Sequence, residues 1–419
     1  METKQSSKSL TVITIVAMMF LYAMISFVTN LAAPVGKIWG ASFEDPAQAE
    51  RMGMLGNLFN FLAYLIMGIP AGNILSKYGY KKTALSAIIL GFLGICVQWL
   101  SGETSSFAVY LCGALLGGFC VCMLNTVVNP MLNLLGGGGN RGNQLNMIGG
   151  TINSLTASLT PMLVGALIGE SLAGKTIVDV NIVLYIAMAV FAVLFFIFWL
   201  TPIAEPEGAG QKITYERSPW AFRHFVLGAI AIFVYVGVEI GVPATLISYL
   251  KPHGFAAAGF VAGLYWLLML VGRTIGSAIG GKVSSRTMVT WVSLVAIVLM
   301  AAAMLAGEKV QVPMLTSWAF ETQTMPLAAL LIVLVGLCTS VMWGSIFNMA
   351  TEGLGKYTAK ASGIFMMMVF GGGVVPQIQS IIAAHNPLVS YIVPIVGVAF
   401  ILYYALWGSK NVNTDIKID

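Results

Sequence analysis

VNIVLYIAMAVFAVLFFIFWL, residues 180–200, contains no charged side chain from end to end. A helix of about 20 apolar residues crosses the hydrocarbon core of a bilayer, so this stretch predicts a membrane-spanning helix. Eleven more stretches of similar length follow the same pattern. We therefore predict an all-α polytopic membrane protein with spans near 10–35, 52–75, 83–101, 106–134, 144–170, 180–200, 221–250, 257–281, 287–306, 326–350, 359–384 and 388–408.

The composition supports this class of protein. The chain is 58% hydrophobic and 9% charged, and its mean hydropathy is +0.88. Soluble domains of 419 residues do not have that balance. The connections are short, so we expect no attached soluble domain. The first apolar run is too long for a signal peptide, which predicts a retained span.

Lys and Arg positions predict the orientation. With twelve spans, the termini and the even-numbered connections lie on one side. That side holds sixteen of the 21 basic residues: Lys4, Lys8, Lys77, Lys81, Lys82, Arg141, Lys212, Arg217, Arg223, Arg273, Lys282, Arg286, Lys356, Lys360, Lys410 and Lys417. The other side holds Lys37, Arg51, Lys175, Lys251 and Lys309. The bias predicts that both termini are cytoplasmic, and it accounts for the net charge of +5 without a nucleic-acid partner.

The polar stretch 201–220, TPIAEPEGAGQKITYERSPW, predicts a cytoplasmic linker between two six-helix halves, 1–200 and 221–419. A short internal similarity supports a duplication. Asn129 precedes Leu135-Gly136 at the same spacing as Asn348 precedes Leu354-Gly355. Parallel repeats of this kind occur in transporters whose two halves rock about a midplane site.

Amides and aromatic residues inside the spans are the candidate solute ligands. Amides match hydroxyl groups as donor and acceptor, and aromatic faces cover the C–H surface of a sugar ring. The alternative for any one of them is a structural role, as a hydrogen bond that joins two helices. The predicted substrate-binding residues are Asn30, Asn57, Asn60, Tyr64, Asn125, Asn129, Asn153, Tyr235, Trp266, Trp343, Asn348 and Gln377.

Glu239 is the one acidic residue in the interior of the predicted spans. A carboxylate in hydrocarbon needs a partner, water or a function. Protonation would remove its charge, so Glu239 is the candidate residue for ion coupling. Two alternatives stay open: a structural pair with Arg273, and a plain hydrogen bond to the substrate. Arg273 itself is interpreted as an anchor at the cytoplasmic end of its span.

Other functional classes find little support. The five cysteines lie in spans without a metal-ligand or CxxC spacing, so no metal or other cofactor is predicted. An enzyme would need a catalytic cluster, which the three His residues at span ends do not supply. The chain has no P-loop for an ATP-driven pump. A non-transporting sensor built on the same fold is a further alternative.

Several motifs resemble the major facilitator superfamily. GNILSKYGYKK, residues 72–82, is similar to its loop signature G-x-x-x-D-R-x-G-R-R/K, with Ser76 in place of the acid. LNTVVNPMLNLLG (124–136) resembles the L-E-T-x-x-N-P-x-x-x-x-L-G pattern of the fucose/glucose/galactose:H⁺ symporter-like family, and NRGNQLNMIGGTINSL (140–155) continues it. YVGVEIG (235–241), GRTIGSA (272–278) and residues 352–376 extend the resemblance into the second half.

The departures from that pattern concern coupling. Relatives of the fucose type carry acids in the first and fourth spans, where this chain has Asn30 and Asn125. Their fifth-span Gln falls near Gly149 or Gly150. Asn keeps the hydrogen bonding of Asp without a titratable proton, so sugar contacts would survive while coupling changes. Three options for coupling then remain: proton coupling through Glu239 alone, coupling to another cation, or facilitated diffusion without coupling.

The resemblance implies a transporter with the twelve-helix fold of that superfamily, which moves a hexose or deoxyhexose by alternating access. H⁺ or Na⁺ is the possible coupling ion. A non-sugar solute, such as a nucleoside or small drug-like compound, is the rival within this class. The resemblance also implies a bacterial inner membrane. We expect the protein to be a monomer.

Overall fold

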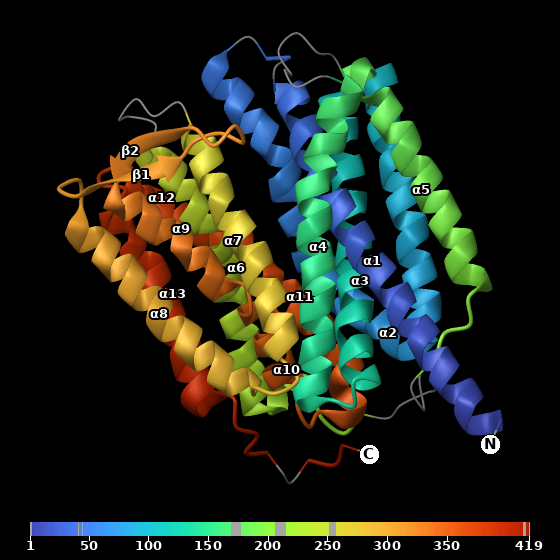
Figure 1. Ribbon diagram of the computed structural model, residues 1–419. Helices are drawn as coiled ribbons and strands as arrows, with labels where there is room; N and C mark the ends of the chain where they lie inside the picture. Colours follow the sequence, from blue (N-terminus) through green and yellow to red (C-terminus); the bar gives the residue numbers. More distant parts are fainter. Residues whose placement is uncertain are drawn as a thin grey trace. The chain divides into compact units, whose positions relative to one another are not determined.

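The computed structural model describes residues 2–40, 42–43, 45–168, 177–205, 215–250, 257–413 and 416–418. The α-helices are α1 (Glu2–Gly40), α2 (Pro46–Glu103), α3 (Phe107–Leu135), α4 (Gly139–Ile168), α5 (Asn181–Leu200), α6 (Arg223–Leu250), α7 (Ala258–Ile279), α8 (Ser285–Ala306), α9 (Leu327–Thr339), α10 (Met342–Thr351), α11 (Thr358–Met367), α12 (Gly371–Ala383) and α13 (Ile392–Tyr403) (Figure 1).

Some predicted features lie outside this description. They are linker residues 206–214, the basic residues Lys175, Lys212 and Lys251, and His253. The side chains of Lys4, Lys8, Lys37, Arg51 and Asn57 are likewise outside it, although their backbones are helical.

The all-α membrane class is confirmed. Ten described helical stretches are long and apolar enough to span a bilayer, and one of them, Leu58–Glu103, contains two predicted spans. They account for eleven of the twelve predicted spans. The fifth span, α4, is helical, but its first half carries Asn140, Asn143, Gln144 and Asn146. The count of twelve stays a prediction at that span.

Spans two and three form one helical run interrupted at a single residue, Gly79, which has φ 81° and ψ 178°. A straight helix of 58 residues would measure about 87 Å, far more than the bilayer, so the chain reverses at Gly79. Glycine adopts this backbone conformation without a Cβ clash. The Glu205 carboxylate of the linker then accepts the N–H groups of Tyr80 and Lys81 at 2.8 and 2.6 Å.

Two other spans are discontinuous. The tenth is divided into α9 and α10 near Ser340, and the eleventh into α11, a 3₁₀ turn η5 (Met368–Phe370) and α12. Glycines permit close approach beside these breaks: a Cβ on Gly363 would overlap the backbone of Gly68 and Gly72, and one on Gly371 would overlap that of Phe233. The predicted spans 326–350 and 359–384 therefore exist as broken helices.

The described residues group into two compact units. The first contains Met1–Leu135, Ile152–Glu216 and Gly355–Met367, and the second contains Gly136–Thr151, Arg217–Leu354 and Met368–Asp419. The chain thus passes between the two units five times, once within α4 and once directly after α11 among them. The division into halves at 201–220 stays a prediction.

One element was absent from the sequence analysis. Residues between α8 and α9 form an antiparallel hairpin of β1 (Gln311–Leu315) and β2 (Thr322–Pro326). Its tip exposes Trp318 and Phe320, and the Trp318 ring lies edge-on to Phe260 of α7, with centroids 5.1 Å apart.

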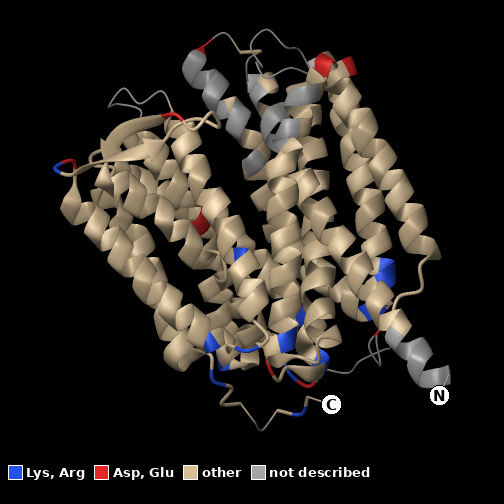
Figure 2. Ribbon diagram, in the orientation of Figure 1, with Lys and Arg blue, Asp and Glu red and all other residues tan. Residues whose placement is uncertain are grey.

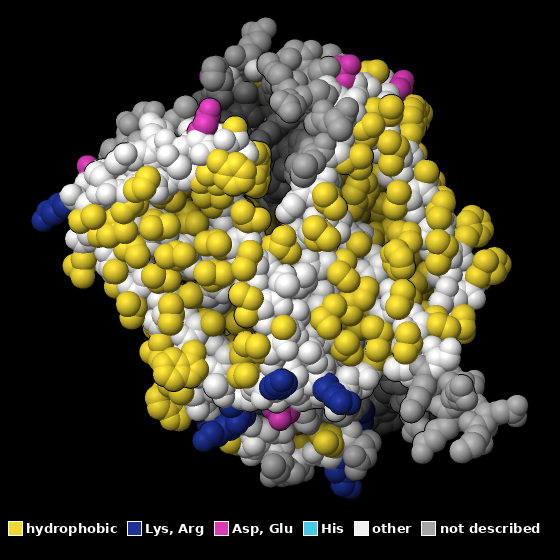
Figure 3. All heavy atoms as spheres, viewed as in Figure 1, with side chains coloured by type: hydrophobic (Ala, Val, Ile, Leu, Met, Phe, Trp, Pro, Cys, Tyr) yellow, Lys and Arg dark blue, Asp and Glu magenta, His cyan; other side chains and the backbone are white. Residues whose placement is uncertain are grey.

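Charge and hydrophobicity follow the predicted membrane orientation. Within each unit, Lys and Arg gather at the end of the helices where its chain terminus lies (Figure 2). Hydrophobic side chains cover much of the helical surface that Figure 3 presents. Exposed residues on these helices include Leu65, Val193, Phe196 and Ile275, as lipid contact requires.

Candidate functional site

In the first unit, four side chains from three helices form an uncharged network that we call the amide cluster: Tyr22 of α1, Tyr64 of α2, and Asn125 and Asn129 of α3. Tyr22 Oη donates to Asn129 Oδ1 at 2.7 Å, and Asn125 Nδ2 donates to Tyr64 Oη at 2.9 Å. Asn129 Nδ2 donates to the Asn125 carbonyl at 2.8 Å. The two asparagines lie one helical turn apart, so they share a face of α3.

Pro130 explains how this part of α3 is stabilised. Proline has no N–H group, so the carbonyl of Thr126, four residues earlier, loses its helical partner. Ser362 Oγ of α11 donates to that carbonyl at 3.1 Å. A buried carbonyl in a membrane helix needs such a replacement, and α11 is thereby tied to α3 beside the amide cluster.

Asn153 and Asn30 lie beside the amide cluster. Asn153 Nδ2 donates to the Tyr22 carbonyl at 3.4 Å, and the Asn153 carbonyl accepts from Ser26 Oγ at 2.6 Å. Asn30 Nδ2 donates to the Ser26 carbonyl at 2.8 Å, within its own helix. Asn60 is half-buried next to Gly118 of α3. The structure therefore brings most of the first-half candidates together.

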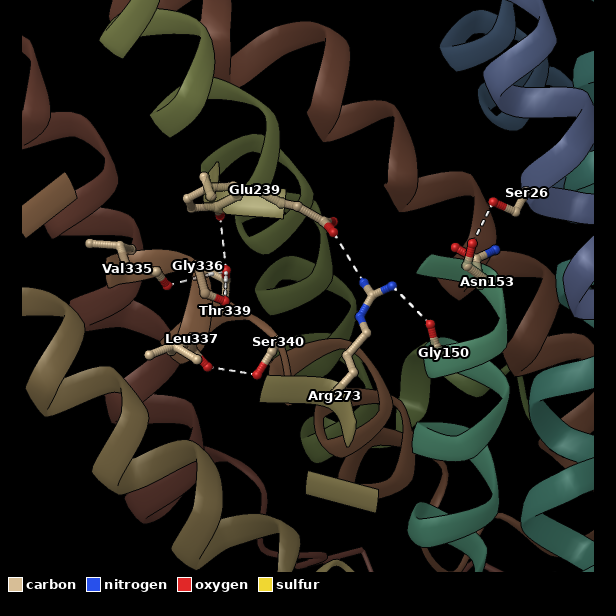
Figure 4. Close-up of polar contacts among 11 residues, drawn as sticks. Ser26, Gly150, Asn153, Glu239, Arg273, Val335, Gly336, Leu337, Thr339 and Ser340 are labelled. Atoms are coloured by element: carbon tan, nitrogen blue, oxygen red, sulfur yellow. Dashed lines mark hydrogen bonds and ion pairs between the residues drawn. The ribbon is translucent and has the colours of Figure 1, made fainter. Parts of the chain in front are cut away.

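In the second unit, Glu239 of α6 pairs with Arg273 of α7. Glu239 Oε1 and Arg273 Nη2 are 3.2 Å apart, and each side chain is 13% exposed. Arg273 Nη1 also donates to the Gly150 carbonyl of α4 at 3.2 Å (Figure 4). The interpretation of Arg273 as an end anchor was wrong, because α6 supplies a carboxylate that compensates its charge inside the helical bundle.

Aromatic residues surround this ion pair. Tyr235 lies one turn before Glu239 on α6, is fully buried, and has its ring centroid 6.4 Å from that of Trp343 on α10. The Tyr235 hydroxyl is buried within interaction range of the Glu239 and Arg273 side chains. We call Tyr235, Glu239, Arg273 and Trp343 the charged cluster.

One face of α7 leads to the charged cluster. Trp266 and Arg273 are seven residues apart and therefore lie on the same face. Gly259 and Gly263 share this face nearer the start of the helix, and a Cβ on either would meet no atom within 4 Å. Trp266 is 40% exposed and packs edge-on to Tyr265. This face is exposed at Gly259, Gly263 and Trp266 and half-buried at Arg273.

Two predicted ligands of the second half lie elsewhere. Asn348 donates to Ser285 Oγ at 2.9 Å and so holds α10 to the start of α8. It is five positions from Trp343, about 140° around the helix. Gln377 is exposed on α12, whereas Gln379 is fully buried against Gly241, with neither amide atom paired among the described residues. Sequence reasoning missed Gln379, which differs from Gln377 only in helical phase.

No metal site emerges from the residues that the structure describes, because they contain no group of three His, Cys, Asp or Glu side chains in reach of one ion. The site chemistry is that of amides, phenols, an indole and one ion pair.

The sequence profile described as Major Facilitator Superfamily matches residues 14–376. The chain belongs to this superfamily. It is therefore a multi-pass membrane transporter and not an enzyme. The resemblance that the motifs indicated is confirmed.

Individual relatives narrow the comparison. A glucose/galactose transporter of Brucella abortus is 30% identical over 366 residues, which cover 84% of each protein. The L-fucose-proton symporter of Escherichia coli is 22% identical over 391 residues, covering 86% of this chain and 85% of the symporter. A crystal structure of the E. coli fucose:proton symporter superimposes with a TM-score of 0.81 at 19% identity, over 96% of this chain and 100% of that one. The superfamily fold is thus shared with that symporter.

Proposed function

We propose that this superfamily member transports a hexose or deoxyhexose across a bacterial inner membrane by alternating access, coupled to protons through Glu239. The relatives named for glucose, galactose and fucose support the sugar class. The observation that carries the proposal is the ion pair of Glu239 and Arg273 beside Tyr235 and Trp343. It combines an ionisable group with aromatic and hydroxyl ligands for a sugar.

The amide cluster would bind sugar hydroxyls from the first unit. Asn125, Asn129 and Asn153 provide donors and acceptors, and Tyr64 adds a hydroxyl. Asn30, Asn57, Asn60, Trp266, Asn348 and Gln377 remain proposed ligands. The predicted halves, 1–200 and 221–419, would be the moving bodies, and the protein would act as a monomer.

Facilitated diffusion is the second candidate, favoured by a specific observation. Asn125 donates its amide N–H to Tyr64 and to the Val121 carbonyl, at 2.9 and 3.1 Å, which no ionised carboxylate can do. The amide cluster is therefore built without an acid. If Glu239 serves only as a structural partner of Arg273, no coupling group remains there.

Uptake of labelled monosaccharides into proteoliposomes tests both candidates. Glucose, galactose and fucose should be compared with a nucleoside control, first without a gradient, then with an inward proton or sodium gradient. Accumulation of one sugar under the proton gradient supports symport. Equilibration without accumulation under either gradient supports facilitated diffusion. Accumulation under the sodium gradient alone would mean that sodium, and not the proton, is the coupling ion. Uptake of the nucleoside alone would overturn the sugar assignment.

A further inference from the structure

The Arg273 guanidinium contacts two helices at once. One of its nitrogens faces Glu239 of α6 and another faces the backbone carbonyl of Gly150 in α4, each at 3.2 Å. In Figure 4 the side chain lies between these two groups and points away from its own helix. The planar fork of arginine suits this division, because its donors point in different directions.

Gly150 brings the backbone of α4 against the Arg273 side chain. A Cβ at this position would lie 3.6 Å from Arg273 Cδ, an ordinary van der Waals distance, so the two helices are in contact here without requiring a glycine. The remaining contacts of this part of α4 lie on the same side of the helix. Asn143 Nδ2 donates to Ser345 Oγ at 3.2 Å, and Gln144 Nε2 donates to the Ser277 carbonyl at 2.9 Å. Met147 packs with Met288 and Val341.

We propose that Arg273 is the positioning residue through which the charge of Glu239 controls the attachment of α4 residues 140–151 to α7 and α10. With Glu239 ionised, the carboxylate holds the guanidinium where it also bonds Gly150. Protonation of Glu239 removes this charge partner from a largely buried cation, and the attachment of α4 weakens. This inference rests on the proposed coupling role of Glu239. It specifies how protonation of that side chain changes the contacts of the moving helices.

Few other titratable groups could produce the same effect. Tyr235 lies on the same helix as Glu239, and Tyr265 lies on α7 with its hydroxyl 2.8 Å from Thr339 Oγ1. Among the described elements that pack against α6, α10 and α12 have no titratable side chain and α9 contributes Cys338. The tyrosines packed against α6 are Tyr391, whose hydroxyl donates to the Val242 carbonyl, Tyr403 of α13, and Tyr404 directly after it. Arg273 is thus the cation whose position depends on the charge of Glu239.

Hydrogen exchange of the purified protein, measured by mass spectrometry, tests the inference without any substrate. Peptides covering 140–155 are followed at acid and alkaline pH, after correction for intrinsic exchange rates. In the wild type, their protection should fall by about tenfold on acidification, as for loss of a hydrogen bond to a charged group. Glu239→Gln should show the low protection at both pH values, and Arg273→Gln should also lose the pH response.

Two further variants separate a switch from general damage. Arg273→Lys keeps the charge but lacks the fork, so the pH response should shrink while the protein stays folded. Arg286→Gln is the matched control. The Arg286 side chain donates two hydrogen bonds to Ser409, away from α4, so this variant should keep the wild-type pH response in α4. A wild-type pH response in Arg273→Gln or Arg273→Lys overturns the inference. Failure of sugar uptake in the wild type would instead contradict the proposed function and leave this exchange result standing.

Discussion

The amide cluster and the charged cluster solve the problem of burying polar groups in a membrane protein in different ways. In the amide cluster, these hydrogen bonds join neutral groups, and Asn129 is fully buried. In the charged cluster, Glu239 and Arg273 compensate each other and keep 13% exposure. Neutral amides hold one arrangement at every pH. An ion pair can change its state, so we propose that the first cluster serves recognition and the second serves coupling.

Glu239→Gln is the strongest test of this division. Gln keeps the shape of Glu239 but cannot exchange a proton, so sugar accumulation under a proton gradient should fall at least about tenfold. Exchange of sugar across the membrane should continue. Uptake and counterflow in proteoliposomes measure the two activities. Glu321→Gln on the exposed hairpin is the matched control, and unchanged accumulation in Glu239→Gln would contradict the coupling role.

Asn129→Ala should have the next largest effect, now on sugar affinity. It removes the acceptor of the Tyr22 hydroxyl and leaves buried polar groups without their partner, which weakens binding by about tenfold. Sugar binding by isothermal calorimetry checks this. Asn73→Ala, on an exposed part of α2, is the control. If affinity is unchanged and only thermal stability falls, the amide cluster is a helix–helix contact.

Asn125→Asp makes the amide cluster resemble the charged one. An ionised Asp cannot donate to Tyr64, so sugar affinity at neutral pH should fall about threefold to fivefold. A protonated Asp regains a donor, and therefore affinity should recover as the pH is lowered. The wild type should lack this component of the pH dependence. Equal pH profiles for the two proteins would show that position 125 does not contact the sugar network.

Glu205→Gln should have the smallest effect, because it changes an exposed carboxylate. It weakens two hydrogen bonds at the start of the helix after Gly79, which should lower the melting temperature by about 2 °C. Proton-driven accumulation should remain. Thermal unfolding in detergent and uptake assays measure the two results. A loss of accumulation as large as that of Glu239→Gln would break the distinction between buried and exposed carboxylates.

The sequence predicts the spans well because hydropathy is a local property of about 20 residues. The lone intramembrane Glu239 is also visible, since its neighbours are apolar. Arg273 is only one of its possible partners in the sequence, because it lies 34 positions away on another helix and packing decides whether the two side chains meet. The same limit applies to Gln379 and Gln377, because two positions along α12 change burial completely.

Breaks within helices escape prediction for a related reason. Ser340 and residues 368–370 lie in apolar stretches without a proline at the break, and tertiary contacts decide where the helices divide. The hairpin at 311–326 has strands of only five residues and lies between two long apolar spans. Its strand pattern is therefore too short to stand out in the sequence.

The one-residue reversal at Gly79 has a consequence for biogenesis. Two apolar helices joined by a single left-handed glycine have no loop that could let one enter the bilayer long before the other. The ribosome and the insertion machinery would therefore handle residues 46–103 as one helical hairpin, whose tip stays with the cytoplasm. A side chain at position 79 would disturb that tip while the protein is still being made, so variants there should be recognised first by quality-control proteases.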